Sequence, residues 1–344
     1  IQVHGEAVDS AAPGMRIALN LQGLDHDEVN RGGVITHGEA LDVVSMFDGT
    51  FNVLARVHEP LPNRSRVLVH LGTAQVEGTL SFLEDVDEVE PGDSVHVQVR
   101  LDRPVPLLPG EPFVVRGFHV LDDYGKTVGG GRALTSAKRR HRRRDVGRIA
   151  LVQALANGSV EEMLCAVVHF EGMEGCPSDE LPRRLPADKG AIAAAIQSGV
   201  EQRTIWDANG HLYHHDVLLT LLERASALLA EHHTQHPAWP GLDTQALRTK
   251  LMPSLSQAFF HVILNEGQRQ GRFTQTGEVL ALPEFQPTLD ARQQANCDVV
   301  LEALTAGGLT PMRVQDLVET IALSAKQLDD TIELLIMQDK LVRV

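Results

Sequence analysis

The stretch RGFHVLDDYGKTVGGGRAL, residues 116–134, contains a Gly-Lys-Thr triplet of the kind found in phosphate-binding loops. Such a loop needs a glycine five residues before the Gly-Lys pair, and a helix must open directly after it. Val120 occupies the position of that glycine, and three glycines, residues 129–131, follow where the helix would begin. Because consecutive glycines destabilise a helix, the sequence argues against nucleotide binding at this stretch.

A second chemical feature is the run KRRHRRR, which places six basic residues and one histidine at positions 138–144. The whole chain carries a formal net charge of −15, so it is not a general polyanion binder. The run is therefore either a solvated linker between domains or a contact with RNA phosphates, and the sequence leaves both open. The candidate RNA-binding residues of this run are Lys138, Arg139, Arg140, Arg142, Arg143 and Arg144.

Two clusters of titratable residues favour structural roles. In EHHTQH, His232 and His236 are four residues apart on a predicted helix, as in zinc sites, but further ligands at a typical spacing are missing. Histidines at the C-terminus of a helix also interact favourably with its dipole, so we expect no metal here. The carboxylates of residues 84–90 favour a solvated loop over an acid–base pair. The chain shows no catalytic motif, and whether it belongs to an enzyme is left open.

The composition limits the remaining classes of function. With 344 residues, 43% of them hydrophobic, the chain can form two or more domains with their own cores. A run of about 18 apolar residues is absent, so we expect no membrane partner. Three separate cysteines, Cys165, Cys176 and Cys297, argue against disulfides and zinc knuckles and suit the reducing cytoplasm. Because residue 1 is Ile, we expect that the chain either begins inside a longer reading frame or has been processed.

The residues ahead of the basic run alternate between apolar and polar, as β-strands do. Strands are predicted over 16–24, over most of 66–83 and over 93–101. One face of the last strand consists of Val95, Val97, Val99 and Leu101. Short alternating strands with Pro-Gly turns between them are typical of antiparallel barrels. In such a barrel the glycines at 129–131 predict a tight bend or bulge where two backbones approach closely.

After the basic run the apolar spacing becomes helical, and a repeat begins at Gly175, Gly241 and Gly308, 66 and 67 residues apart. Each repeat starts with a short helix and continues with a second helix, predicted over 189–202, 254–267 and 325–338. A short β segment follows each second helix, and Asn209-Gly210 and Thr276-Gly277 supply hairpin turns in the first two repeats. This order is that of a winged helix, so we expect three in tandem.

Winged helices that read DNA need Arg, Lys, Asn or Gln on the second helix. The first such helix is mostly alanine, and the third is acidic, with Asp329, Asp330 and Glu333. Only the middle helix and the residues directly after it offer suitable side chains, of which Arg269 and Arg272 are candidate RNA-binding residues. A packing or spacer role is therefore favoured, although a winged-helix DNA-binding transcriptional regulator remains the alternative function.

These features together resemble one family, the selenocysteine-specific translation elongation factors of the SelB type. GMRIALNLQGLDHDEVNRGGVI is similar to the second half of domain II of translational GTPases. RSRVLVHLGTAQVEGTLSFLE and PGDSVHVQVRLDRPVPLLPGEPFVVR, followed by TVGGGRAL, resemble domain III. The Thr-Val-Gly-Gly-Gly ending before a basic stretch separates this family from elongation factor Tu. Tandem winged helices after domain III are a further mark of the family.

The resemblance implies a multidomain β plus α chain, with translation-factor β-barrels followed by tandem winged-helix units. Its expected domains are the second half of domain II (1–38), domain III (39–136), a basic linker (137–145) and three winged helices (146–215, 216–285 and 286–344, the last truncated). No Gly-x-x-x-x-Gly-Lys-[Ser/Thr] motif occurs, so the GTPase domain of the family would lie outside this chain, together with GTP and Mg. The unit that grips the mRNA hairpin would follow Val344. We therefore expect an internal fragment with no cofactor of its own.

The function implied by the resemblance is delivery of selenocysteinyl-tRNA to the ribosome at a recoded UGA codon. The full-length protein would act as a GTP-bound monomer in the cytoplasm, anchored in bacteria by an mRNA hairpin. The barrels would form a platform against the tRNA acceptor arm, and the winged helices would reach toward the mRNA. Arg31 lies in the loop of domain II that matches the family, and it is the one candidate for the aminoacyl pocket, whose residues are otherwise unassigned.

Overall fold

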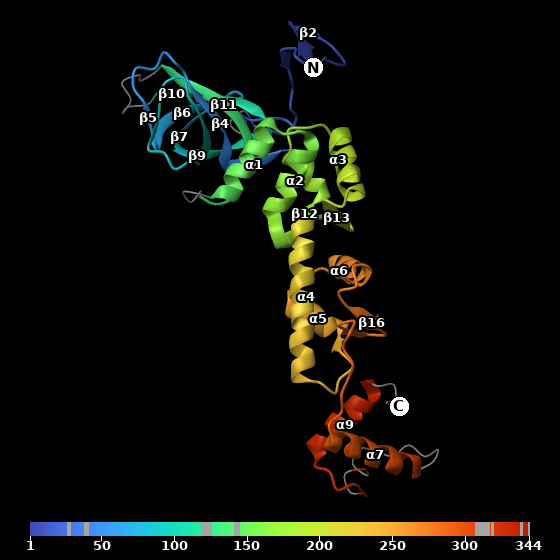
Figure 1. The fold of residues 1–344 in the computed structure, drawn as a ribbon. Coiled ribbons are helices and arrows are strands. Elements are labelled where there is room, and N and C mark those ends of the chain that lie inside the picture. The colour runs from blue at the N-terminus through green and yellow to red at the C-terminus, as the bar shows by residue number, and fades with distance from the viewer. Residues whose placement is uncertain are drawn as a thin grey trace. The chain divides into compact units, whose positions relative to one another are not determined.

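The computed structural model describes residues 1–25, 29–37, 41–117, 126–140, 145–306, 317, 320–337 and 340–342 (Figure 1). The chain forms two compact units, Ile1–Phe170 with Asp179–Gln197, and Glu171–Ser178 with Ser198–Val344. None of the helices in the described residues combines the length and the apolar character that a membrane crossing requires.

The first unit contains a closed barrel of antiparallel strands in the order β10-β11-β4-β9-β7-β6 (Figure 1). The strands are β4 (Asp42–Val53), β6 (Ser65–Leu71), β7 (Ala74–Phe82), β9 (Ser94–Leu107), β10 (Glu111–Gly117) and β11 (Thr127–Ser136). Two short strands, β5 (Leu61–Pro62) and β8 (Glu88–Val89), pair with each other. The strands predicted over 66–83 and 93–101 are confirmed, because they form β6, β7 and the first part of β9.

The core of the barrel is aromatic and aliphatic. The four β9 residues predicted to share one face are all buried, namely Val95, Val97, Val99 and Leu101. The Phe113 ring lies edge-on to Phe47, with 5.2 Å between centroids, and is stacked on Phe51 at 6.1 Å. Such pairs contribute about 0.5–1.5 kcal/mol each beyond their buried area. The aromatic cluster therefore joins β4 to β10 across the interior.

The three glycines at 129–131 lie inside strand β11 and form no tight bend. The register between β10 and β11 shifts where Val115 faces Gly129 and Arg116 faces Thr127, so the other predicted form, a bulge in this stretch, is confirmed. The predicted close approach of two backbones is confirmed. A Cβ on Gly131 would lie 1.7 Å from the carbonyl oxygen of Thr50, and a Cβ on Gly129 would lie 2.3 Å from the Phe51 ring. The glycines let β11 lie against β4 and the aromatic core, and the register shift with β4 comes later in the strand.

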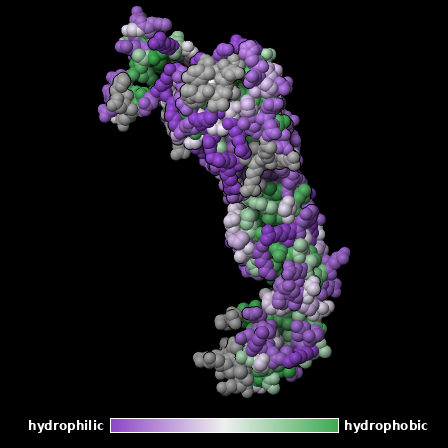
Figure 2. Space-filling view, turned by 90° about the vertical axis from the view of Figure 1, so that its left-hand side faces the viewer, coloured by the Kyte–Doolittle hydropathy of each residue, from purple (hydrophilic) through white to green (hydrophobic). Residues whose placement is uncertain are grey.

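The N-terminal residues form a small sheet of β1 (Gln2–Val3), β2 (Glu6–Ala7) and β3 (Ile17–Ala18). The strand predicted over 16–24 is therefore two residues long. Within the described residues its apolar side chains find no surface to cover them, since Leu19 and Leu24 are 42% and 51% exposed. The uppermost part of Figure 2 shows the resulting hydrophobic patch. Strand propensity depends on packing against neighbours, so alternation alone was not sufficient.

Helices follow the barrel in the first unit. They are α1 (Val146–Asn157), α2 (Val160–Glu171), the 3₁₀ helix η3 (Ser178–Arg183) and most of α3 (Lys189–Glu201). Helix α1 packs against strands β4, β9 and β11 of the barrel and buries Leu151, Val152 and Leu155. The barrel and the first helix therefore form one packed body.

The second unit contains two small sheets with the orders β12-β14-β13 and β15-β17-β16. Their strands are β12 (Cys176–Pro177), β13 (Ile205–Ala208), β14 (His211–His214), β15 (Leu242–Asp243), β16 (Thr274–Thr276) and β17 (Val279–Ala281). The helices of this unit are α4 (His215–Gln235), α5 (Thr244–Leu251), α6 (Gln257–Arg269), α7 (Ala291–Ala306) and α9 (Ala325–Met337). The predicted second helices are confirmed, since α3, α6 and α9 coincide with them.

The strand pairing repeats with the sequence. Cys176 pairs with Leu212 in the first sheet, and Leu242 pairs with Leu280 in the second. These leading strands are too short to show alternation, so the sequence did not reveal them. The predicted Asn209-Gly210 turn is confirmed, with φ of 58° and 80°, as a type I′ turn requires. The second turn comes one residue later than predicted, at Gly277-Glu278, because Thr276 still pairs with Val279.

The third repeat is described in part. Helices α7 and α9 share a core that includes Val300, Leu328 and Leu335. The short helix predicted to begin after Gly308 lies outside the described residues except for Leu317.

Replacing Gly131 by alanine is expected to lower the free energy of unfolding of the barrel by about 3 kcal/mol, because the new Cβ meets backbone that cannot move aside. Gly147→Ala is the matched control, since the nearest atom to its Cβ would be 3.7 Å away and alanine favours the helix α1. Calorimetry of the full chain measures both. An unchanged barrel transition in Gly131→Ala would contradict the close packing of β11 on β4.

Candidate nucleic-acid interface

The basic run begins where strand β11 ends, on the surface of the barrel. The backbone N–H of Ala137 donates a hydrogen bond to the carbonyl oxygen of Met46 at 3.0 Å. The side-chain amide of Gln98 donates from Nε2 to the carbonyl oxygen of Arg139 at 3.2 Å. The backbone of the run is therefore attached to β4 and β9. The exposed side chains at this end of the run are Lys138, Arg139 and Arg140.

The other end of the run is attached through helix α1. Asp145 caps this helix, with its Oδ1 accepting a hydrogen bond from the backbone N–H of Arg148 at 3.1 Å. The Arg148 guanidinium pairs with the carboxylate of Asp48 on β4, which has no exposure to solvent. The same guanidinium lies over the Phe170 ring, 5.2 Å from its centroid. Between these two attached ends, the described residues do not include Arg142, Arg143 and Arg144.

Asp48 connects the two ends. Besides Arg148, it accepts a hydrogen bond from Gln98 Nε2 at 2.9 Å, and this is the amide that also binds the backbone of Arg139. A buried carboxylate is tolerated only when it is paired and hydrogen-bonded, so these partners stabilise one another's positions. The arrangement fixes where the basic run leaves the barrel and where it enters the helix.

Arg31, the candidate for an aminoacyl pocket, donates a hydrogen bond from Nε to the carbonyl oxygen of Thr73 at 2.9 Å. The neighbouring Gly32 has a φ of +98°, and a Cβ there would lie 2.7 Å from Cβ of Ala74. These contacts join the N-terminal segment to the β6–β7 turn of the barrel. A role of Arg31 in aminoacyl recognition stays a prediction.

Arg269, a candidate RNA-binding residue, is engaged with a buried carboxylate. Its Nε donates to Glu266 Oε2 at 2.7 Å, and its Nη2 binds the other carboxylate oxygen. Hydrogen bonds from Arg269 lower the pKa of Glu266 to about 2. Burial opposes this shift, and a hydrogen bond from Gln270 adds to it. Glu266 is 5% exposed and therefore depends on this arginine. The positive charge of Arg269 is already neutralised within the unit.

The other candidates on the middle winged helix are also hydrogen-bonded within it. Arg272 is half-buried and donates from Nε to Gln270 Oε1 at 2.8 Å. Gln268, at the end of α6, donates to Gln275 of the wing at 3.0 Å. Among the candidate RNA-binding residues that the structure describes, those at 138–140 are exposed and adjacent, whereas Arg269 and Arg272 are engaged within the second unit.

The histidines of the EHHTQH segment lie at the end of α4. His232 and His233 are each 6% exposed. His232 Nε2 is 3.0 Å from the carbonyl oxygen of Gly241, and His233 Nε2 accepts a hydrogen bond from the backbone N–H of Leu282 at 3.1 Å. Burial lowers the pKa of both rings. The dipole interaction expected from the sequence needs charged rings, so burial and hydrogen bonding explain these histidines better.

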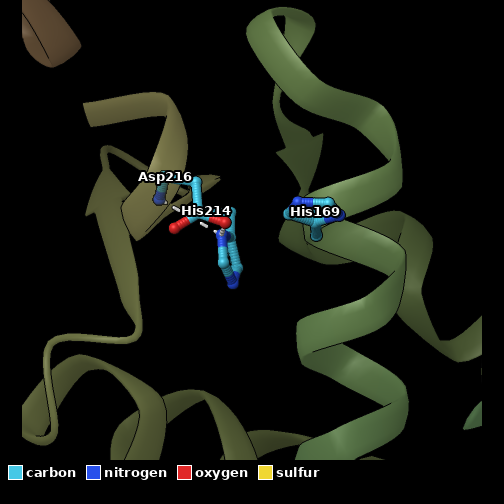
Figure 3. A group of neighbouring side chains, drawn as sticks. All are labelled: His169, His214 and Asp216. Carbon is cyan, nitrogen blue, oxygen red and sulfur yellow. Dashed lines mark hydrogen bonds and ion pairs between the residues drawn. The ribbon is translucent and has the colours of Figure 1, made fainter. Parts of the chain in front are cut away.

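A second group of histidines lies ahead of this segment in the sequence, in HLYHH at 211–215, and these histidines have structural contacts as well. Figure 3 shows His214 and Asp216 at the start of α4. His214 Nδ1 accepts a hydrogen bond from the backbone N–H of Asp216 at 3.2 Å and is 3.4 Å from its Oδ2. His214 thereby acts as the N-cap of α4. His169, also drawn in Figure 3, is an exposed residue of α2.

The residues that position the run, Asp48, Gln98 and Arg148, were missed by the sequence reasoning. The available signal was an acidic residue in the otherwise mostly apolar strand DVVSMFDGTFNV. A charged residue in such a place is almost never fully buried unless it is paired. The identity of its partner, 100 residues away, could not be read from spacing.

The barrel and the second winged helix both match known family models. Residues 49–140 match the model described as "Selenocysteine-specific elongation factor, beta-barrel domain", and residues 226–282 match "Elongation factor SelB, winged helix". In these two parts the chain is similar to the SelB family of elongation factors. The first match includes the barrel from Gly49 onward and the start of the basic run. The second includes α5, α6 and the wing formed by β16 and β17.

A curated relative and a solved structure agree with this assignment. A "Selenocysteine-specific elongation factor" of Desulfomicrobium baculatum is 28% identical over 347 residues, which cover 100% of this chain and 54% of the relative. The crystal structure of a bacterial selenocysteine-specific elongation factor, EF-Sec, has a TM-score of 0.57 at 18% identity, covering 96% of this chain and 49% of that chain. This chain thus spans about half the length of these SelB-type proteins, and the likeness to the crystal structure concerns the fold.

Arg148→Gln is expected to lower the free energy of unfolding by about 3–5 kcal/mol, because it leaves the Asp48 carboxylate buried without its cation. The double variant Asp48→Asn with Arg148→Gln should recover part of this loss, since no charge then remains buried. Arg103→Gln is the control on the same barrel, because this exposed arginine donates a hydrogen bond to the Gln75 carbonyl oxygen at 3.3 Å and forms no ion pair with a described residue. Urea unfolding measures all three. Equal stabilities of Arg148→Gln and Arg103→Gln would contradict the role of the pair.

The buried histidines predict a pH dependence of the second unit. Their folded pKa values lie below the unfolded value of about 6.5, so the unfolded chain binds more protons at lower pH. Their contribution to stability is complete above about pH 6.5 and falls below it, by up to about 1.4 kcal/mol per pH unit for each ring. His233→Gln should flatten this dependence, whereas the exposed His261→Gln should not. The measurement is the free energy of unfolding between pH 5 and 8. An equal dependence on pH in His233→Gln and His261→Gln would contradict the role of the buried ring.

Proposed function

We propose that this chain is part of a selenocysteine-specific elongation factor that delivers selenocysteinyl-tRNA to the ribosome at recoded UGA codons. One observation carries the proposal: a SelB-type barrel has a basic run attached to it at both ends, through Gln98, Asp48 and Arg148. Lys and Arg contacts to phosphates position a protein on a nucleic acid without reading its sequence. A run that is already ordered at its ends loses less conformational entropy when it binds.

The parts of the chain would divide this work. The barrel and its basic run would face the backbone of the tRNA, and the winged helices would direct an arm toward the mRNA. The hairpin that marks the recoded codon would be bound by a part of the full-length protein outside this chain. The protein would work in the cytoplasm, where the ribosomes are.

GTP and Mg²⁺, which the family resemblance implies, do not fit the Gly-Lys-Thr stretch at 125–127. Val120 stands where a phosphate-binding loop needs glycine, and the residues after Lys126 form strand β11 instead of a helix. Backbone N–H groups at a helix N-terminus, which would cradle the phosphates, are thus lacking at this position. GTP dependence therefore belongs to the full-length protein in this proposal.

The alternative function, DNA-binding regulation through winged helices, is not favoured. Its best candidate for base contacts, Arg269, is bound to Glu266, and the remaining side chains of α6 offer little positive charge. A duplex reader needs free donors on this helix.

Replacing Arg139, Arg140, Arg142, Arg143 and Arg144 by alanine is expected to weaken tRNA binding and to flatten its dependence on salt. Each lost phosphate contact should reduce the slope of log K against log salt by roughly 0.7–0.9. The control replaces exposed arginines outside the run, namely Arg56, Arg103 and Arg292. The change in salt slope is compared between the two sets per charge removed. Filter binding at several KCl concentrations gives the slopes. Equal slopes per charge in the two sets would reduce the run to a linker.

A further inference from the structure

A cavity of about 240 Å³ lies on the barrel next to the start of the basic run. It is lined by three exposed arginines and by two half-buried hydroxyl side chains, namely Arg64, Arg100, Arg140, Thr79 and Ser81. These residues come from three separate parts of the first unit: the loop before β6, the strands β7 and β9, and the segment after β11. The basic run itself contributes only one of them, Arg140.

The register of the barrel explains why these groups meet. Arg100 of β9 is directly opposite Thr79 of β7 on one side and Met46 of β4 on the other. Two residues earlier, Gln98 is opposite Ser81. Side chains two apart on a strand share a face, and directly opposite residues have Cβ atoms about 4.5–5.5 Å apart. Arg100, Thr79 and Ser81 therefore lie on one face of the sheet, and all three line the cavity.

The loop that carries Arg64 is held in a strained conformation. Arg64 has a φ of +65°, which side chains other than glycine rarely adopt and which persists only where the surroundings impose it. The preceding Asn63 supplies that constraint. Its backbone N–H donates to the Asp87 carbonyl oxygen at 2.7 Å, its Nδ2 donates to Val86 at 3.3 Å, and its Oδ1 accepts from the Phe82 N–H at 3.0 Å. These bonds fix the backbone from which the Arg64 side chain extends.

Arg140 is positioned by the hydrogen bond from Gln98 to the carbonyl oxygen of Arg139. Because Gln98 is also bound to the buried Asp48, this attachment does not depend on the mobility of a surface side chain. The same network that holds the basic run thereby places its residue 140 at the cavity.

The arginines of the cavity have no directly bonded carboxylate in the part of the chain that the structure describes. Within the described residues, Arg64, Arg100 and Arg140 form no ion pair or side-chain hydrogen bond. The carboxylate that acts on Arg100 through charge, Asp102, already binds Arg66 at 2.6 Å. In a chain with a net charge of −15, three adjacent arginines without acidic partners are an uncommon concentration of positive charge.

We propose that this cavity binds one phosphate group, held by the guanidinium groups of Arg64, Arg100 and Arg140 and by the hydroxyl groups of Thr79 and Ser81. Guanidinium forks match the oxygen atoms of phosphate and form charge-assisted hydrogen bonds with them. The phosphate comes either from an RNA backbone or from free inorganic phosphate. An RNA source rests on the proposed function, because the cavity would then extend the contact that the basic run makes with RNA. The phosphate site itself does not depend on the proposed function.

The first experiment titrates the full chain with inorganic phosphate at constant ionic strength and follows the backbone amide resonances. Saturable shifts are expected at residues 64, 79–81 and 98–100, and the double variant Arg64→Gln with Arg100→Gln should bind at least about tenfold more weakly. Arg56→Gln, an exposed arginine of the same barrel outside the cavity, should leave the titration unchanged. Shifts that do not saturate, or that are equal in both variants, would overturn the free-phosphate source.

The second experiment measures the affinity of the same variants for tRNA against KCl concentration. The double variant, unlike Arg56→Gln, should bind tRNA more weakly and should lose roughly 0.7–0.9 of the salt slope per lost contact. This result would assign the phosphate to RNA. Phosphate binding with unchanged tRNA affinity would assign it to the free ion. If the double variant keeps both its phosphate binding and its tRNA affinity, the proposed site is wrong. If the unmodified chain does not bind tRNA at all, the proposed function fails, and the phosphate titration still decides the site.

Discussion

The buried carboxylate of Asp48 is the constraint on which the arrangement of the first unit depends. It has no solvent exposure, and its charge is balanced by Arg148 from a helix that follows the barrel. Removing either partner would leave an uncompensated charge in the interior, so the helix cannot leave the barrel without a large loss of stability. The basic run is a short connection between two fixed points, and its position on the barrel follows from this one pair and from Gln98.

The second unit follows the opposite principle, because its charges are neutralised or removed. Glu266 binds Arg269, and burial favours the neutral form of His232 and His233. Such groups fix the packing of the winged helix, and they engage Arg269, the candidate cation of α6. In the proposed function, the RNA-facing part is therefore the barrel, where the arginines of the cavity have no ion pair within the described residues.

Local patterns in the sequence predicted the regular elements well. Two-residue alternation located β6, β7 and β9, and helical spacing located the second helices of all three repeats, since both periods follow from backbone geometry. The pattern failed at 16–24, where Leu19 and Leu24 stay exposed. At 127–131 it predicted the bulge and the close backbone approach, but it could not show that the group facing Gly129 is the Phe51 ring. Arg269 and Glu266, three apart on one helix, could have been paired from sequence. Contacts between residues distant in the chain, such as Asp48 with Arg148, could not.

Hydrogen exchange of the full chain with and without selenocysteine tRNA tests the central claim most directly, because it locates the RNA contact along the backbone. If the barrel and the basic run contact RNA, amide exchange should be slower in β9 and in the segment from the end of β11 to the start of α1. A DNA duplex of similar length should give little protection there. Protection confined to α6 and the wing of β16 and β17, with none on the barrel, would contradict the account.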